Sequence, residues 1–200
     1  MNNIKEANSG KYLGLPLVIT GSKKQVFAYI VDKARSKMQG WKHNLLNYAG
    51  KEVLLKSVIM ALPTYTMSCC RLPKGLCAKI CGHMAKFWRG QNEEERKVQW
   101  IRWEKITQVK GNGGLGFREL EHFISALLAK QLWRHLLQLE LIVSKVLGAK
   151  YKLSQTGWEG EAPRNASWVW RSICSSCSVL QKGMWKGVGD GTTINIWRDK

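Results

Sequence analysis

Three glycines, Gly111, Gly113 and Gly116, have the G-x-G-x-x-G spacing that can hold a dinucleotide at the start of a helix. A dinucleotide site also needs a buried strand before the glycines and an acidic residue about 20 positions after them. The preceding segment WEKITQVK is charged where a parallel strand would be continuously apolar, and the acidic residue is missing. A helix is expected after the glycines, but the other two features are missing, so the sequence argues against a nucleotide loop.

Four cysteines and a histidine crowd one short stretch and raise the question of a zinc site: Cys69, Cys70, Cys77, Cys81 and His83. On a helix, Cys77 and Cys81 fall within an apolar arc, whereas His83 projects about 120° away from Cys77. Because these side chains diverge, they do not converge on one ion. We therefore predict buried thiols that behave as small apolar groups, with no bound metal and no cofactor.

The remaining candidates for chemistry are scattered. The chain has only three aspartates, Asp32, Asp190 and Asp199, and they are far apart. Two-metal polymerases and nucleases hold their ions with clustered carboxylates, so no catalytic residue is predicted. Cys174 and Cys177 have C-x-x-C spacing with no second pair in reach, and both an incidental pair and an incomplete metal site stay open.

Positive charge is the most prominent property of the chain. Lys and Arg number 32 against 14 acidic residues, which gives a formal net charge of +18, and the excess is spread along the sequence. Such an excess favours a polyanionic partner, nucleic acid before membrane. On an expected helix over residues 74–89, Lys79, Lys86 and Arg89 lie opposite the apolar arc, together with His83. This row is either a solvated face or a line of cations that contacts phosphates, and we take Lys79, Lys86 and Arg89 as candidate nucleic-acid-binding residues.

Apolar periodicity predicts the elements that would position these side chains. We expect a helix from Ser22, as its cap, to about residue 38 with Gly40 as its stop, and another from 51 to about 62 ended by Pro63. Residues 64–72 are ambiguous, and 96–109 form a helix or an irregular link. The further expected helices cover 74–89 with Gly90 as stop, a long segment after Phe117, and segments around 141–151 and 167–183. Alternating runs around residues 189–191 predict a β-hairpin.

The expected fold is mainly α-helical and bundle-like, with a small β-hairpin at the C-terminus. We place a helical region at 1–152, a linker at 153–166 that contains Gly157, Gly160 and Pro163, and a helix plus hairpin at 167–200. No run of 18 or more apolar residues is present, so no membrane span is expected. The opening MNNIKEANSG does not look like a secretion signal, which predicts a nuclear or cytoplasmic protein with reduced thiols.

Nine ordered blocks carry a resemblance to a known family: KYLGLPL, GKEVLLKSVIMALPTYTMSC, LPKGL, FWRG, GGLGFREL, ALLAKQLWRHL, VLGAKY, SWVWRSI and VGDGTTINIWRD. From Lys11 to Asp199 the chain resembles the region after the polymerase core in plant LINE-type, non-LTR retrotransposon reverse transcriptases. In that family the region follows the palm, which carries a Tyr-x-Asp-Asp box, and precedes a zinc-binding segment. The resemblance implies a thumb and connection that hold the template–primer, and it implies that GGLGF is a turn that starts the long helix.

The chain departs from the family pattern at several positions. The palm box is absent, Arg89 stands where the family has a second Trp, and one extra residue precedes Gly189. The sequence also stops before the family's zinc-binding segment, as a fragment would. The resemblance therefore implies non-catalytic binding to the phosphate backbone of RNA or an RNA–DNA hybrid. Two alternatives stay open: a degenerate retroelement remnant with no independent biochemical activity, and a basic amphipathic membrane-surface binder.

Overall fold

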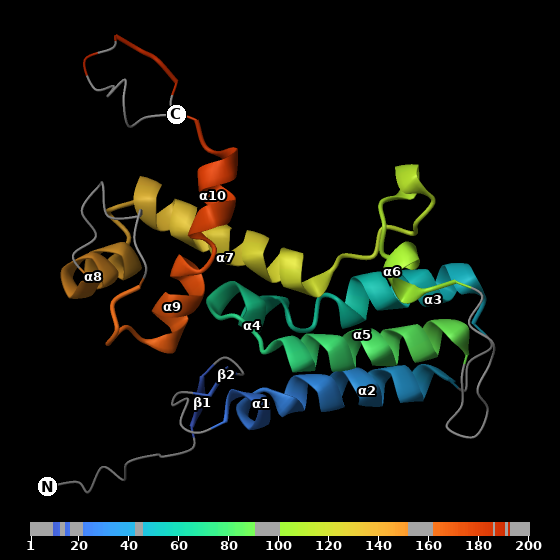
Figure 1. The fold of residues 1–200 in the computed structure, drawn as a ribbon. Coiled ribbons are helices and arrows are strands. Elements are labelled where there is room, and N and C mark those ends of the chain that lie inside the picture. Colours follow the sequence, from blue (N-terminus) through green and yellow to red (C-terminus); the bar gives the residue numbers. More distant parts are fainter. Residues whose placement is uncertain are drawn as a thin grey trace, which may run out of the picture. The chain divides into compact units, whose positions relative to one another are not determined.

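The computed structural model describes residues 10–12, 15–16, 22–42, 46–90, 101–151, 162–185, 187–190 and 192. The chain forms two compact units, Met1–Met67 with Leu72–Ile124, and Ser68–Arg71 with Ser125–Lys200. Helices dominate the described part of both units (Figure 1). The prediction of a mainly helical fold is therefore confirmed.

The first unit contains a minimal antiparallel strand pair, in which Lys11 is opposite Pro16, and then a series of helices. Its elements are β1 (Lys11–Tyr12), β2 (Leu15–Pro16), α1 (Lys23–Val26), α2 (Ala28–Lys42), α3 (Tyr48–Leu54), the π-helical turn η1 (Leu55–Ile59), α5 (Lys74–Arg89), α6 (Trp103–Ile106) and the 3-10 turn η2 (Lys110–Asn112). α4 (Thr64–Cys69) and α7 (Leu120–Leu137) each contribute residues to both units.

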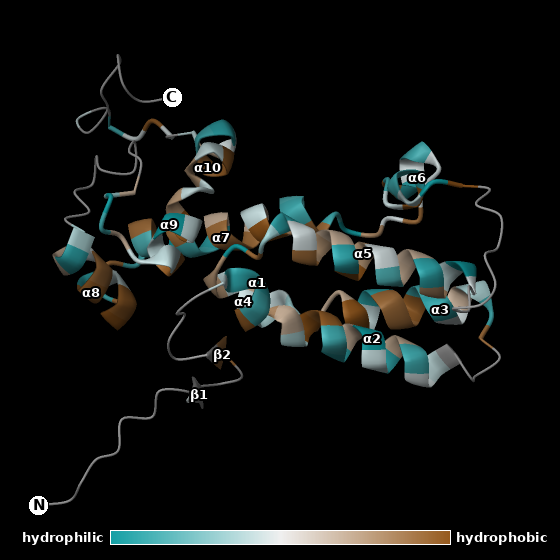
Figure 2. Cartoon of the chain, turned by 60° about the horizontal axis from the view of Figure 1, so that its bottom comes forward, coloured by the Kyte–Doolittle hydropathy of each residue, from teal (hydrophilic) through white to brown (hydrophobic). Residues whose placement is uncertain are grey.

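The core of the first unit lies where α2 packs along α5 (Figures 1 and 2). The buried side chains recur at helical spacing and match the predicted arcs: Phe27, Ile30, Val31, Ala34 and Met38 on one side, and Leu76, Cys77, Ile80, Met84 and Phe87 on the other. Burial of one large apolar side chain stabilises a fold by about 1.5–3 kcal/mol relative to exposure. This interface therefore fixes which faces of α2 and α5 point outward.

The predicted N-terminal helix begins after Ser22, which is the N-cap residue of α1, but three details differ from the prediction. The Ser22 side chain makes no capping hydrogen bond, and the helix is interrupted at Phe27, which separates α1 from α2. The helix also continues through Gly40 to Lys42. A glycine stops a helix when the chain there adopts a positive φ, and Gly40 keeps helical geometry. Packing of Met38 and the half-buried Trp41 continues the buried stripe past the expected end.

The second predicted helix starts earlier than expected, and it changes from an α-helix to a π-helix after Leu54. Asn47 caps α3, because its side-chain oxygen accepts a hydrogen bond of 2.8 Å from the Gly50 N–H. After Leu54 the chain widens into η1, in which the Met60 N–H donates to the Leu55 carbonyl at 3.0 Å. Leu55 and Ile59 of this turn are fully buried, whereas Val53 of α3 is 62% exposed. Pro63 does end the segment, and the ambiguous residues after it form α4.

The glycine segment forms a compact turn before α7, as predicted. Gly113 and Gly116 have φ values of 77° and 69°, which favour glycine. The turn is held by backbone hydrogen bonds from Leu115 N–H to the Ile106 carbonyl, 2.9 Å, and from Gly116 N–H to the Gln108 carbonyl, 2.8 Å. No strand precedes the glycines within residues 101–119. The interpretation that excludes a dinucleotide loop agrees with this geometry.

The second unit contains most of α7, then α8 (Ile142–Tyr151), α9 (Trp168–Cys174) and α10 (Cys177–Gly183). Its core includes Leu128, Leu132, Trp170 and Ile173. The rings of Tyr151 and Trp170 stack in parallel at 5.1 Å, which ties α8 to α9. No helix in the described residues is long and apolar enough to cross a bilayer.

The predicted C-terminal hairpin is not supported. The described residues from 184 to 192 form no strand. Instead, the Asp190 carboxylate accepts hydrogen bonds from the Thr192 N–H, at 3.2 Å, and from the Thr192 hydroxyl, at 2.8 Å. This is a local turn of the kind that Asp favours, and it competes with strand pairing. Residues 193–200 and most of the predicted linker, 153–161 of 153–166, lie outside the described residues, so the linker stays a prediction.

Candidate nucleic-acid interface

The row of cations predicted on α5 lies on the outer side of that helix. Pro73 precedes its first turn, and Gly90, at φ 64°, ends it in the left-handed conformation that favours glycine. Lys79 and Lys86 are exposed, whereas Arg89 is half-buried. None of the three forms an ion pair with a carboxylate in the part of the chain that the structure describes. The row is therefore on the surface, with charge available to a partner.

The structure adds a second helix to this surface. Arg35, Met38 and Gln39 of α2 and His83, Lys86 and Phe87 of α5 line a shallow groove, which we call the α2–α5 groove. Met38 and Phe87 are buried and form its apolar floor. Arg35 was not among the candidate residues that the sequence predicted. Its partners become visible only when the pairing of α2 with α5 is known.

His83 stands among positive charges in this groove. Partial burial lowers its pKa, and the charges of Arg35, Lys86 and Lys79 lower that pKa further. Asp32 has the opposite and smallest effect. The lowered pKa keeps His83 neutral at pH 7, because an unperturbed histidine already titrates near 6.5. The row and the groove thus combine permanent cations with one group that can gain a proton.

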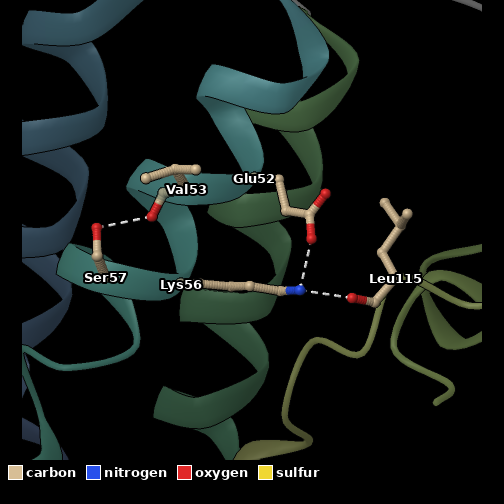
Figure 3. Close-up of polar contacts among 5 residues, drawn as sticks. All are labelled: Glu52, Val53, Lys56, Ser57 and Leu115. Atoms are coloured by element: carbon tan, nitrogen blue, oxygen red, sulfur yellow. Dashed lines mark hydrogen bonds and ion pairs between the residues drawn. The ribbon is translucent and has the colours of Figure 1, made fainter. Parts of the chain in front are cut away.

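Not every lysine of the first unit is free to meet a partner. The Lys56 ammonium lies 2.6 Å from Glu52 Oε1 and 2.6 Å from the carbonyl oxygen of Leu115, as Figure 3 shows. It also lies over the Phe117 ring, 5.2 Å from the centroid. Lys74 pairs with Glu121 at 3.4 Å. Lys56 therefore has a structural role, and the candidate interface is concentrated on α2 and α5.

The cysteines of α5 behave as apolar residues. Cys77 is buried, as predicted, and Cys81 is half-buried. Burial raises the pKa of the Cys81 thiol, and the nearby Glu119 carboxylate raises it further, against a hydrogen bond with Trp103. Among the described residues, no group of three His, Cys, Asp or Glu side chains could hold a metal ion.

These features define a basic helical protein with a cationic surface on two paired helices. The chain is 39% identical over 142 residues to the uncharacterized mitochondrial protein AtMg00310 of Arabidopsis thaliana, with 70% of this chain and 92% of that protein covered. The chain belongs to the same family as that plant protein. No family model matches it, and neither does any solved structure.

A second relative is much longer. The chain is 29% identical over 189 residues to the putative ribonuclease H protein At1g65750 of Arabidopsis thaliana, which covers 93% of this chain and 30% of that protein. The chain thus spans less than a third of this relative. Together the two relatives support a plant retroelement-related protein, the coarser part of the resemblance found in the sequence.

Proposed function

We propose that this chain is a non-catalytic nucleic-acid-binding region of a reverse transcriptase-like retroelement protein, which contacts the phosphate backbone of RNA or an RNA–DNA hybrid. The observation that carries the proposal is the cationic face of α5. Lys79, Lys86 and Arg89 lie opposite a buried arc, and no carboxylate in the described residues pairs with them.

The wider electrostatics support the same partner. A net charge of +18 attracts polyanions over a long range, and cations on a rigid helix contact successive phosphates without reading bases. The name of the longer relative, a putative ribonuclease H protein, also connects this family to RNA. As a thumb and connection, the chain would hold the template–primer and supply no catalytic group.

A triple variant tests the interface. Replacing Lys79, Lys86 and Arg89 by Gln should weaken binding to an RNA–DNA hybrid whatever its sequence. Each phosphate contact contributes about 0.7 to 0.9 to the slope of log affinity against log salt, so that slope should flatten by roughly two units. A matched control replaces three exposed lysines outside α2 and α5, Lys105, Lys130 and Lys182, by Gln and should change the slope less. Circular dichroism should show equal helicity in all three proteins.

Unaltered affinity and slope in the folded triple variant would make the row a solvated face and would favour the remnant without independent activity. A second measurement addresses catalysis. Because the three aspartates Asp32, Asp190 and Asp199 are far apart in the sequence, the purified chain should extend no primer on an RNA template with Mg²⁺ or Mn²⁺. Extension that persists after removal of contaminating polymerases would contradict a non-catalytic role.

A further inference from the structure

The α2–α5 groove has the composition of a site for one anionic group. A guanidinium, an ammonium and an imidazole, from Arg35, Lys86 and His83, surround the apolar floor. The guanidinium fork and the ammonium are the two side-chain groups that most often bind phosphate oxygens. The buried floor of Met38 and Phe87 keeps water away from one side of a bound group and strengthens its attraction to the three nitrogens.

The charges that face His83 come from both helices of the groove. Among the described residues, Arg35 and Asp32 act from α2, and Lys79 and Lys86 act from α5, so three of these four charges are positive. Protonation of His83 therefore adds a further positive charge close to these cations. An anion between Arg35 and Lys86 would reverse this penalty, because the protonated imidazole would then face a negative charge.

We propose that the α2–α5 groove binds one backbone phosphate of the nucleic acid, and that His83 takes up a proton when the phosphate enters. The proton comes from solvent and stays on the imidazole, where it adds a charge-assisted hydrogen bond to a phosphate oxygen. This inference rests on the proposed function and goes further, because it adds Arg35 and His83 to the interface and makes the affinity depend on pH.

The test measures affinity for an RNA–DNA hybrid at constant ionic strength between about pH 8 and pH 6, the range around the ordinary histidine pKa. Affinity of the unchanged protein should rise severalfold toward pH 6, because a group whose pKa is raised by a bound anion takes up a proton together with that anion. His83→Gln should abolish the rise. His83→Arg, which is always charged, should bind tightly at both pH values.

Two controls separate this site from other effects. His122→Gln removes an exposed histidine that pairs with Glu119 on the approach to α7, and this variant should keep the full pH dependence. Inorganic phosphate, compared with chloride at equal ionic strength, should not displace the hybrid. The phosphates on either side of the bound one are in the same strand and also contact the cations of α5, so the strand is held at several points. Circular dichroism at each pH verifies that every variant is folded.

The outcomes are distinct. The same pH dependence in His83→Gln as in the unchanged protein would overturn the inference while leaving the proposed function intact. Specific displacement by inorganic phosphate would overturn the assignment to a nucleic-acid backbone. Absence of binding at every pH would instead contradict the proposed function. A rise that is lost in His83→Gln and kept in His122→Gln establishes the site.

Discussion

The ammonium group of Lys56 donates a hydrogen bond of 2.6 Å to the carbonyl oxygen of Leu115, which is 59 residues further along the chain. This contact joins the π-helical turn η1 to the glycine turn that precedes α7. Glu52, one helical turn before Lys56, accepts a second hydrogen bond from the same ammonium, and this bond lowers the pKa of the Glu52 carboxyl. One side chain thus links two segments that are distant in sequence.

Replacement of Lys56 by Met should destabilise the protein by about 1–3 kcal/mol, because it leaves the Leu115 carbonyl and the partly buried Glu52 carboxylate without their donor. The free energy of unfolding in urea measures the loss. Lys105→Met, at an exposed position on α6, serves as the control and should stay within about 0.5 kcal/mol of the unchanged protein. Equal destabilisation by both variants would show that the Lys56 contacts contribute nothing specific.

The glycine turn offers a sharper comparison. A Cβ at Gly114 would lie 2.1 Å from the carbonyl oxygen of Gln108, whereas a Cβ at Gly111 would have no atom within 4 Å. Gly114→Ala should therefore force the backbone apart and cost at least about 1–3 kcal/mol. Gly111→Ala should be neutral or stabilise the fold by about 0.4–1 kcal/mol, through the unfolded chain. Thermal unfolding of the two variants measures the difference, and equal melting temperatures would contradict the close approach.

Acidification should lower the stability of the second unit, because it protonates His135. Its Nδ1 lies 3.0 Å from the Ser144 hydroxyl, which connects α7 to α8, and both side chains are buried. Burial lowers the pKa of His135, and the charge of Arg134 lowers it further. A group whose pKa is lower in the folded state binds fewer protons there than in the unfolded state. Its stabilising contribution is therefore complete above the unfolded pKa, about 6.5, and is lost as the pH falls below it.

The measurement compares the free energy of unfolding at about pH 7.5 and pH 5, on either side of that value. His135→Gln should lose about 0.5–1.5 kcal/mol at the higher pH, the usual net contribution of a hydrogen bond, and should lose less than the unchanged protein on acidification. His83→Gln is the comparison variant, because it removes a different histidine whose pKa is also lowered in the folded protein. If acid weakens the His135→Gln variant as much as the unchanged protein, the Ser144 contact is not the cause.

The thiols should differ in reactivity. Burial raises the pKa of Cys70 to about 12, with a further effect from Cys69, whereas that of Cys174 is raised to about 11. Because the thiolate is the nucleophile, Cys70 should be alkylated more slowly than Cys174 at pH 8, by about tenfold for the difference in pKa. Brief treatment with iodoacetamide followed by peptide mass spectrometry measures both rates. Urea should remove the difference, and faster labelling of Cys70 in the folded protein would contradict its burial.

Sequence reasoning succeeded where local signals agreed with the tertiary packing. Pro73 and Gly90 bound α5 at both ends, and its apolar arc is continuous, so its limits and its buried face were predictable. At Gly40 the local signal for a stop lost to the packing that continues past Met38. At Leu55 the chain adopts an i to i+5 hydrogen bond, which no apolar periodicity of 3.6 residues reveals.

In the candidate site, too, some residues were predictable from the sequence and others were not. The positions of Lys79, Lys86 and Arg89 follow from one helical wheel, because a single helix carries all three. Arg35 and Gln39 required knowledge of which helix packs against α5 and at which rotation. Pairing of helices depends on complementary side-chain surfaces, and a single sequence contains no direct record of it.

The π-helical turn η1 has a consequence for how chains of this family can change in length. The i to i+5 hydrogen bond of a π-helix spans one residue more than the i to i+4 hydrogen bond of an α-helix. Removal of one residue between Leu55 and Ile59 would return this segment to α-helical geometry, while Asn47 would still cap its start and Pro63 would still end it. Lys56, which lies inside this turn, would then change its position relative to Glu52 and the Leu115 carbonyl. Single-residue deletions here should therefore be tolerated by the helix itself and selected against only through the contact with Leu115.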